Sequence, residues 1–562
     1  MINGENRIMK KLSPLQEERL QYQPKLPESL KHGIASLILK EGEKTKAVKD
    51  EDKIKELFPN CYGAPIVEFV FDKNSNNKSN EKNVGVILSG GQAPGGHNVI
   101  SGLYDALKNA NKNNKLYGFL GGPSGIIEGD YIEFDDKKID EYRNTGGFDI
   151  IGSGRTKLET EEQFEKALNV CKKLNIQGIV IIGGDDSNTN ACMLAEWLKA
   201  RNTGIQVVGC PKTIDGDLKN DQIEISFGFD TATKTYGELI GNIQRDANSA
   251  KKYWHFIKIM GRSASHVALE AALQTQPNIT LISEEVENEK MSLDQIVTYI
   301  ADVVAKRSEI GKNFGIAVIP EGLIEFIPEM KSMIANLNDL MAKLEKDENY
   351  TNANNEEKFA IIEKELESNN KHVFCSLPQL IKAQLLMDRD PHGNVQVSKI
   401  ETEKLLIEMV KTKLAQMKKE GKFNGKFSDQ AHFFGYEGRC AFPSNFDADY
   451  CYSLGYNAFA LLNFGLTGYL SSIKNLTKCS KDWVAGGVPL TMMMNMEKRH
   501  GVFKPVIQKA LVDLKGPVFN ELKQNRENWA LNDEYLFPGA IQYFGPEKVC
   551  DLKTRTLVLE KQ

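Results

Sequence analysis

Short apolar runs alternate with amphipathic stretches along the first half of the chain, and this pattern predicts an α/β fold. Apolar runs with the length of buried parallel strands occur at 84–88, 116–120, 179–182 and 205–208. The stretches at 97–108 and 188–199 have the length of helices, and apolar residues fall at helical spacing from Phe164 to Cys171. Strands that alternate with such helices are typical of a doubly wound parallel sheet.

A second run of the same kind follows. Apolar segments of strand length occur at 255–260, 279–282 and 314–319. Apolar residues at helical spacing occupy 293–304, between the last two of these segments. The sequence therefore predicts two doubly wound, Rossmann-like α/β domains, the first at 83–240 and the second made of 241–327 and 431–470.

Three regions do not follow this rhythm. Residues 1–82 are polar and rich in lysine, so we expect an N-terminal extension, of which 66–71 can add a strand at a sheet edge. Lysine and glutamate surround apolar positions at helical spacing in 328–430, which predicts a mostly helical insertion. Residues 471–562 are expected to form a C-terminal segment that packs on both domains.

Composition excludes several classes of protein. The 562 residues carry a formal net charge of −5, which gives no basic surface for nucleic acid. No apolar run approaches the roughly 20 residues of a membrane span, so we expect no membrane partner. The nine cysteines are scattered and include no Cys-x-x-Cys pair, which indicates a reducing, cytoplasmic location. The eight histidines include no His-Glu-x-x-His, so a dedicated zinc site is not expected.

Acidic residues follow two neighbouring strands of the first predicted domain. The run at 179–182 leads into Gly-Gly-Asp-Asp-Ser at 183–187, and the run at 205–208 leads into Pro-Lys-Thr-Ile-Asp-Gly-Asp at 211–217. Ligands of open parallel sheets bind beyond the carboxyl ends of the strands, so the two acidic segments are expected to share one cleft. One can hold a metal and the other can act as a general base. A helix cap at Ser187 and an Asp-Gly turn at Asp215 are the simpler alternatives.

Other loops at strand ends suit a phosphate. The loop at 89–98 is rich in glycine and joins a strand to a helix, where free amides and the helix dipole favour an anion. It lacks the Gly-x-Gly-x-x-Gly spacing and the Lys-Ser/Thr of a Walker A loop, and a tight turn alone would also explain it. Arg262 and Arg439 follow glycines near strand ends and can bind a phosphate, although an isolated arginine is usually a surface residue.

Taken together, these segments resemble the phosphofructokinase superfamily, and specifically its long, pyrophosphate-dependent form. The resemblance spans roughly 83–449 and includes the glycine loop followed by six short motifs in the family's order. These are Gly-Ser-Gly-Arg at 152–155, Gly-Gly-Asp at 183–185, Thr-Ile-Asp-x-Asp at 213–217, Met-Gly-Arg at 260–262, Pro-Glu-Gly at 320–322 and Tyr-x-x-Arg at 436–439. Members that use ATP tend to have glycine where this chain has Asp186 and a small residue where it has Lys212. A carboxylate at Asp186 would repel the α-phosphate of ATP, and Lys212 suits a compact pyrophosphate.

The resemblance implies a reversible transfer of a phosphoryl group from pyrophosphate to the 1-hydroxyl of fructose 6-phosphate. It implies Mg²⁺ as the cofactor, held by Asp185, in a pyrophosphate-binding domain at 83–240, with the sugar bound by the second domain. The implied catalytic residues are Asp215 as the base, Lys212, Asp186, Arg262 and Asp217. The implied pyrophosphate-binding residues are Gly90, Gly91, Arg155 and Lys212. The implied sugar-binding residues are Thr213, Ile214, Asp215, Lys252, Tyr253, Met260, Gly261, Arg262, Glu321, Tyr436, Glu437, Gly438 and Arg439.

The chain departs from many relatives at two of these positions. Tyr253, beside Lys252, stands where an arginine often reaches the sugar phosphate of a neighbouring subunit, and Tyr436 stands where histidine is common. The family's shared sites imply a homodimer, or at least a dimer. An ATP-dependent phosphofructokinase and a catalytically silent regulatory subunit remain as alternatives. Physiological direction, response to fructose 2,6-bisphosphate and the role of the helical insertion are left open.

Overall fold

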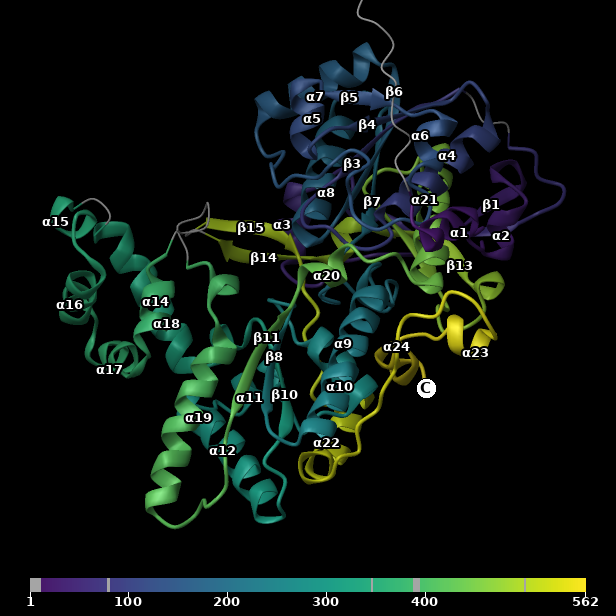
Figure 1. The fold of residues 1–562 in the computed structure, drawn as a ribbon. Coiled ribbons are helices and arrows are strands. Elements are labelled where there is room, and N and C mark those ends of the chain that lie inside the picture. The colour runs from purple at the N-terminus through teal and green to yellow at the C-terminus, as the bar shows by residue number, and fades with distance from the viewer. Residues whose placement is uncertain (1–11, 78–80, 345–346, 388–394, 500–501) are drawn as a thin grey trace, which may run out of the picture.

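The fold is built on two main β-sheets that lie in separate parts of the molecule (Figure 1). The computed structural model describes residues 12–77, 81–344, 347–387, 395–499 and 502–562. We call the nine-stranded sheet with its helices the first lobe and the four-stranded sheet with its helices the second lobe. Among the described residues, no helix combines the length and the apolar character that crossing a membrane requires.

The first lobe has a parallel centre and antiparallel edges. Its strands, in spatial order, are β1 (Leu37–Lys44), β2 (Pro65–Phe71), β13 (Val484–Pro489), β12 (Tyr469–Lys474), β7 (Gln206–Pro211), β6 (Ile176–Gly183), β3 (Asn83–Leu88), β4 (Lys115–Phe119) and β5 (Tyr131–Glu133). The run from β12 to β4 is parallel, whereas β5, β13, β2 and β1 each pair antiparallel with a neighbour. Two strands from the predicted N-terminal extension thus widen the sheet. β1 forms the edge, and β2 lies between β1 and β13.

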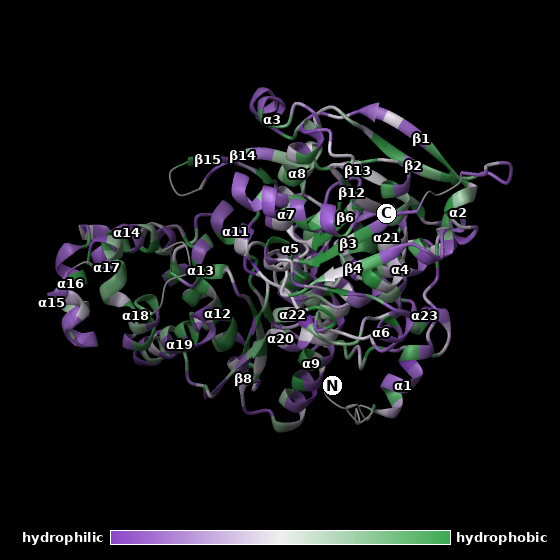
Figure 2. Cartoon of the chain, turned by 90° about the horizontal axis from the view of Figure 1, so that it is seen from above, coloured by the Kyte–Doolittle hydropathy of each residue, from purple (hydrophilic) through white to green (hydrophobic). Residues whose placement is uncertain are grey.

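Alternate residues of the central strands enter opposite cores of the first lobe, as the pleat of a strand requires. Val86 of β3 lies in the core shared with α4 (Gly96–Ala110) and α21 (Asn445–Asn463). Its neighbour Ile87 lies in the core on the other face, which α5 (Pro123–Glu128), α7 (Glu161–Lys173) and α8 (Asp185–Ala200) complete. In Figure 2 the central strands are coloured mainly as hydrophobic residues, whereas a peripheral helix such as α7 is mainly hydrophilic. The remaining helices of this lobe are α1 (Pro14–Gln21), α2 (Glu28–Lys31), α3 (Glu51–Leu57) and α6 (Asp136–Asp140).

The second lobe is a smaller, wholly parallel sheet. Its order is β11 (Asp429–Phe434), β8 (Trp254–Ile259), β10 (Gly315–Pro320) and β9 (Ile279–Thr280). One face contributes Ile257 and Val318 to the core that continues from the first lobe through α9 (Phe229–Ala250) and α10 (His266–Thr275). The other face packs with α12 (Leu293–Glu309) and with the insertion. Short helices α11 (Ser283–Asn288), α13 (Leu323–Phe326) and α20 (Tyr436–Arg439) follow its strands.

The insertion is helical in the structure. It consists of α14 (Pro328–Leu344), α15 (Glu348–Thr351), α16 (Asn355–Glu365), α17 (Ser368–Ser376), α18 (Gln379–Leu385) and α19 (Thr402–Lys419). Figure 1 shows α14 to α18 as a cluster at the side of the molecule, with α19 beside the second sheet. The prediction of an α/β fold with two Rossmann-like units and a helical insertion is therefore confirmed.

One predicted boundary is wrong. Residues 431–470 were expected to complete the second domain, but only β11 and α20 do so. Helix α21 packs along α4, and β12 pairs with β7 of the first sheet, so the chain returns to the first lobe after α20. The reason is that the apolar face of α21 covers the parallel centre of the larger sheet, which the strand pattern alone does not reveal.

The C-terminal residues contact both lobes. The antiparallel hairpin of β14 (Met494–Arg499) and β15 (Val502–Ile507) lies against α8 of the first lobe. Helix α22 (Pro517–Leu531) packs on α10 and α12 of the second lobe, and α24 (Arg555–Glu560) also contacts α10. Helix α23 (Glu547–Cys550) comes between α22 and α24 in the sequence.

Candidate active site

The predicted phosphate loops meet at the carboxyl ends of β3, β6 and β7. These strands are parallel neighbours, so the loops that follow them emerge at one edge of the sheet. Two backbone hydrogen bonds join the loops, from Gly90 to the carbonyl of Gly154 (2.8 Å) and from Lys212 to the carbonyl of Gly183 (3.0 Å). The glycine loop is thus joined to the loop that carries Arg155, and the two acidic segments are joined to each other.

Helix α8 starts directly at the first acidic segment. Gly184 is its N-cap, and Asp185 and Asp186 occupy its first turn, three residues earlier than the sequence predicts. The buried amide of Asn188 donates to the carbonyls of Gly183 (2.6 Å) and Gly184 (2.9 Å), which fixes the turn from strand to helix. Ser187 donates to Ser89 of the glycine loop (2.8 Å) and is not the N-cap. Two acidic side chains at a helix N-terminus are electrostatically favourable, so the acids are stable there without a metal.

Lys212 is a buried cation beside the glycine loop. Its side chain is only 6% exposed, and its Nζ would lie 3.3 Å from a β-carbon built on Gly90. Gly90 has a φ of +83°, so glycine serves here for both its backbone conformation and its missing side chain. The pKa of Lys212 is lowered to about 8, chiefly by burial and also by the charge of Arg439, while Asp215 and Asp185 oppose the shift. A lysine of this kind gains most from a bound anion.

The second acidic segment holds two carboxylates in different surroundings. Asp215 is half-buried, and its backbone N–H donates to the hydroxyl of Thr213 (3.0 Å) in a bend rather than an extended strand. Asp217 is 6% exposed, and burial raises its pKa to about 7, with the neighbouring charge of Asp215 as the next cause. Ile214 is buried beneath them. Asp215 is therefore the carboxylate of this pair that is accessible to a hydroxyl.

A lysine that the sequence did not single out lies between the acids. The Nζ of Lys509 is 3.5 Å from a carboxylate oxygen of Asp185 and 3.8 Å from one of Asp217, and it donates to the hydroxyl of Ser263 (2.7 Å). Burial alone would lower the pKa of Lys509, but Asp185, Asp217 and other acids raise it overall. We call Asp185, Asp215 and Asp217 the acidic cluster.

The second lobe presents its own strand ends to this edge. After β8, the N–H of Gly261 donates to the carboxylate of Glu321, which follows β10 (3.1 Å). Glu321 is 5% exposed, and burial raises its pKa, while the N–H of Gly261 opposes the shift. The backbone of Arg262 lies so close to Gly322 that a β-carbon there would be 1.9 Å from the Arg262 carbonyl. Met260 is buried and Arg262 is exposed, so Glu321 supports the loop that presents the arginine.

Arg439 reaches from the second lobe to the glycine loop of the first. A β-carbon on Gly91 would lie 3.2 Å from its guanidinium carbon, and its Nε is buried without a hydrogen-bond partner. Tyr236 of α9 holds this segment, because its hydroxyl donates to the carbonyl of Gly435 (2.6 Å) and its ring leaves no room for a side chain at Gly438. The other two side chains of the motif, those of Tyr436 and Glu437, are exposed.

Two predicted residues lie elsewhere. Lys252 and Tyr253 precede β8, whereas Met260 to Arg262 follow its carboxyl end. At about 3.3 Å per residue the strand separates the two groups by roughly 20 Å. Within one chain they are therefore not part of this site.

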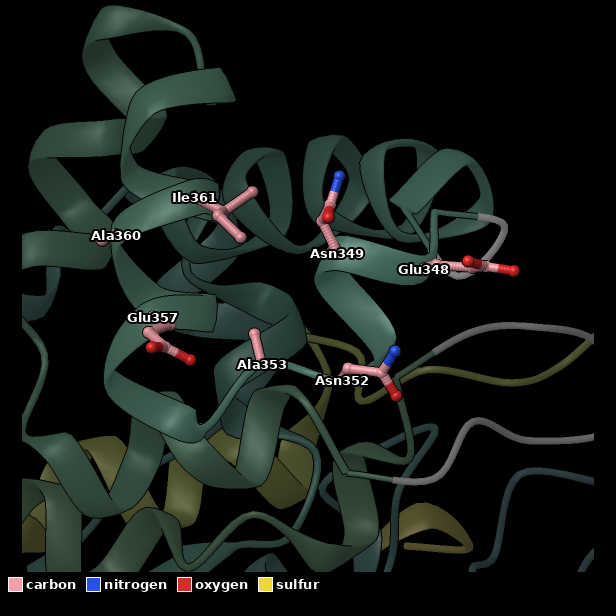
Figure 3. A pocket seen from close by; sticks show the side chains of 7 residues that line it. All are labelled: Glu348, Asn349, Asn352, Ala353, Glu357, Ala360 and Ile361. Carbon is pink, nitrogen blue, oxygen red and sulfur yellow. The ribbon is translucent and has the colours of Figure 1, made fainter.

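A hollow on the surface of the insertion is also remote from the strand ends. It lies between α15 and α16 of the insertion, and Figure 3 shows side chains from both helices and from the turn between them. The lining residues are Glu348, Asn349, Asn352, Ala353, Glu357, Ala360 and Ile361. They include two carboxylates and no cation, so this hollow does not suit a phosphate.

The donor set fits a metal that is completed by its ligand. Among the described residues, no three His, Cys, Asp or Glu side chains are grouped as a full metal site. Mg²⁺, however, often uses one or two carboxylates and takes its other ligands from water and phosphate. The ammonium of Lys509 already stands between Asp185 and Asp217, which indicates that this position favours a cation.

Comparison with known proteins gives concordant results. The phosphofructokinase family model matches residues 83–462. The chain is 57% identical to the pyrophosphate–fructose 6-phosphate 1-phosphotransferase of Porphyromonas gingivalis over 549 residues, which cover 98% of this chain and 99% of that one. It is 54% identical to the enzyme of the same name from Treponema pallidum, with 98% and 97% covered. The solved structure of a pyrophosphate-dependent phosphofructokinase from Nitrosospira multiformis is similar in fold, with a TM-score of 0.54, 16% identity and coverage of 84% and 97%.

Proposed function

The chain belongs to the phosphofructokinase family, and we propose that it reversibly transfers a phosphoryl group from pyrophosphate to the 1-hydroxyl of fructose 6-phosphate. The products are fructose 1,6-bisphosphate and phosphate. The observation that carries this proposal is the meeting of Lys212, the glycine loop and Arg439 beside the acidic cluster. Cations and free amides beside a carboxylate base are the parts that phosphoryl transfer requires.

The chemical step needs a base, a held donor and a neutralised leaving group. Asp215 takes the proton of the sugar 1-hydroxyl while that oxygen attacks the nearer phosphorus of pyrophosphate. The bridging P–O bond breaks, and its electron pair leaves with the second phosphate. Lys212 and Arg262 stabilise the charge on the group in transfer, and Asp217 supports Asp215 from its buried position. Gly90, Gly91 and Arg155 hold the leaving phosphate.

The sugar is held mainly by the second lobe. Arg262 and Arg439 supply positive charge for the 6-phosphate of the sugar. Arg439 also reaches the glycine loop of the first lobe. Glu321 contributes to sugar binding indirectly. Its carboxylate accepts a hydrogen bond from the N–H of Gly261 and so sets the position of Arg262. The remaining contacts are assigned to Thr213, Ile214, Met260, Gly261, Tyr436, Glu437 and Gly438.

Asp185 would hold the metal, which we take to be Mg²⁺. When bound, the ion shields the negative charge of pyrophosphate and so eases attack by another oxygen. Asn188 fixes Asp185 at the start of α8, and the first-turn amides of this helix favour a nearby phosphate.

Donor choice follows from Asp186 and Lys212. Asp186 is exposed in the first turn of α8, where its carboxylate repels the additional phosphate of ATP. Lys212 places a single buried charge at the glycine loop, which matches the compact pyrophosphate.

We further assign Lys252 and Tyr253 to the site of a second copy of the chain. They lie at the far end of β8 from their own site, so only a partner subunit can bring them to the sugar phosphate. The enzyme is therefore proposed to be a homodimer with shared sites. All nine cysteines are free, which agrees with a reducing cytoplasm.

The test is turnover of fructose 6-phosphate and Mg²⁺ with either pyrophosphate or ATP. We expect activity with pyrophosphate and almost none with ATP. Activity with ATP alone would overturn the donor assignment, and activity with neither would identify a regulatory subunit. Gel filtration with light scattering tests the dimer on the same preparation.

The Asp186→Gly variant tests the origin of donor choice. Removing the carboxylate relieves the repulsion, so measurable turnover with ATP should appear in the same assay. Asp294→Gly is the control, because Asp294 is likewise exposed in the first turn of a helix, α12. Undiminished exclusion of ATP would show that another residue blocks the nucleotide.

A further inference from the structure

The segment that follows the β14–β15 hairpin crosses from the first lobe to the second through the candidate site. On the first lobe, the N–H of Ile507 donates to the hydroxyl of Thr189 (3.2 Å), and the N–H of Ala510 donates to the backbone carbonyl of Asp217 (2.7 Å). On the second lobe, the carbonyl of Ala510 accepts from His266 (2.8 Å), and the N–H of Val512 donates to Glu284 (3.1 Å). The segment is thus fixed at both ends.

Lys509 stands at the middle of this crossing, and its side chain enters the acidic cluster. Its Nζ makes one hydrogen bond, to Ser263 of the second lobe, and two longer ion pairs, to Asp185 and Asp217 of the first. The side chain of Asp185 is 22% exposed and that of Asp217 is 8% exposed. The ammonium therefore bridges the lobes and neutralises carboxylates that have little water around them.

We propose that Lys509 is a positioning residue that acts as the counter-cation of the acidic cluster. Its ammonium gives up the ion pair with Asp185 when Mg²⁺ binds to that carboxylate. This inference rests on the proposed function, because it takes Asp185 as the metal ligand. Ser263 and Asp217 keep the ammonium in place, so it can release Asp185 without leaving the cluster. Lys509 thereby keeps the carboxylates in position when no metal is bound.

The charge balance of the cluster supports this role. Asp185, Asp186, Asp215 and Asp217 all lie close enough to act on the charge of Lys509. The buried cation on the other side, Lys212, faces the glycine loop, where a phosphate binds. Without Lys509 the cluster would keep its carboxylates and lose the cation that touches two of them. Such a cluster should be less stable alone and should bind Mg²⁺ more tightly.

The experiment measures the melting temperature of the full chain in chelator and in saturating Mg²⁺, with no substrate present. For Lys509→Met, Mg²⁺ should raise the melting temperature by at least about 2 °C more than it does for the wild type. Lys509→Gln keeps an N–H donor for Ser263 but removes the charge, so it should respond in the same way. Lys509→Arg keeps the charge and should respond like the wild type. Lys515→Met is the matched control, because Lys515 is exposed in the same segment.

The outcomes decide between charge and simple packing. A Lys509→Met or Lys509→Gln protein that responds to Mg²⁺ no more than Lys515→Met overturns the proposal. A variant that folds only when Mg²⁺ is present supports it, and one that folds in neither buffer counts against it. Pyrophosphate-dependent turnover of the wild type is measured in parallel. Loss of that activity with a selective Mg²⁺ response would overturn the proposed function and leave the role of Lys509 intact.

Discussion

The strand ends of the two lobes face the same site but are built differently. At the first lobe two of the charged groups are buried, because Lys212 and Asp217 are each only 6% exposed. At the second lobe two of the side chains assigned to the sugar are open, since Arg262 is exposed and Tyr436 is 70% exposed. The strand ends of the first lobe, which we call the first edge, therefore hold charged groups in place before any ligand binds. The open side chains at the strand ends of the second lobe, the second edge, gain most of their contacts only when the sugar binds.

This difference separates chemistry from recognition. Charges in a dry, fixed setting act strongly on a transferring group, because no solvent has to rearrange around them. Exposed charges on a supported loop bind a substrate but contribute little to folding. Substitutions at the first edge should therefore reduce kcat and alter pH dependence. Substitutions at the second edge should mainly raise the KM for the sugar.

The largest effect is expected for Asp215→Asn at the first edge. The amide cannot accept the proton of the sugar hydroxyl, so kcat should fall by about 10²–10⁴-fold. Steady-state turnover with pyrophosphate measures the loss, and calorimetric titration of fructose 6-phosphate checks that sugar binding is kept. Asp221→Asn, an exposed aspartate on the same segment, is the control. A turnover equal to that of Asp221→Asn would remove Asp215 from the role of base.

The next effect is expected for Lys212→Met, which removes the buried cation. Loss of one preorganised charge should lower kcat/KM for pyrophosphate by about 10²–10³-fold. Because burial lowers the pKa of Lys212 to about 8, the wild-type kcat/KM should fall as the pH rises through that value. The pH–rate profile of the variant should lack this step. Lys515→Met serves as the control of equal charge.

The lowered pKa of Lys212 also predicts that the stability contributed by this residue rises with pH, whereas kcat/KM falls. The native pKa of Lys212 lies below its ordinary value of 10.5, so between about 8 and 10.5 the unfolded chain binds more protons than the native one. The contribution of Lys212 to the free energy of unfolding therefore rises with pH in this window. Urea titrations at several pH values should show a smaller rise for Lys212→Met. An identical pH dependence in the variant and the wild type would contradict the lowered pKa.

Sequence reasoning found most of the first edge because its parts are local. Asp185 and Asp215 each follow an apolar run at once, and the rule that ligands bind at strand ends brings neighbouring runs together. The sequence predicts the start of α8 three residues too late, because Asp185, Asp186 and Asn188 are polar and do not continue the apolar spacing of the helix. The amide of Asn188 shows its purpose only when the carbonyls of Gly183 and Gly184 are adjacent.

The contacts that cross between the lobes could not be predicted in this way. Lys509 reaches Asp185 from more than 300 positions along the chain, and no local pattern distinguishes it from other lysines. Tyr236 looks like an ordinary apolar position of α9, although its hydroxyl holds Gly435. The misplaced boundary at 445–470 has the same cause, since pairing of β12 with β7 is set by the tertiary fold and not by spacing.

A smaller effect is expected at the second edge from Arg262→Ala. A charge-assisted hydrogen bond contributes about 1.5–3 kcal/mol, so the KM for fructose 6-phosphate should rise by about 10–100-fold. Because Arg262 is exposed, the free energy of unfolding should change by no more than about 0.5 kcal/mol. Initial rates over a range of sugar concentrations and a urea titration measure the two quantities. Arg201→Ala, at an exposed arginine of the first lobe, is the control. A lowered kcat at unchanged KM would mean that Arg262 acts only on the group in transfer and does not bind the sugar.

The smallest effect is expected for Tyr236→Phe, which weakens the support of the second edge. The variant loses the hydrogen bond to the carbonyl of Gly435, and about 1 kcal/mol of unfolding free energy should go with it. The segment that carries Tyr436 and Arg439 then moves more freely, so the KM for the sugar should rise by about fivefold while kcat is kept. Initial-rate measurements separate the two constants.

Tyr469→Phe is the control that makes the Tyr236 result specific. Tyr469 is also buried, and its hydroxyl donates to the carbonyl of Pro65 (2.8 Å); the two residues begin β12 and β2 of the first sheet and are not at the carboxyl ends that form the site. Both variants lose one buried hydrogen bond, so both should unfold more easily by a similar amount. Only Tyr236→Phe should alter the KM, because only Tyr236 holds a segment of the second edge. An equal KM in the two variants would mean that the second edge is as rigidly built as the first, and the contrast between them would fail.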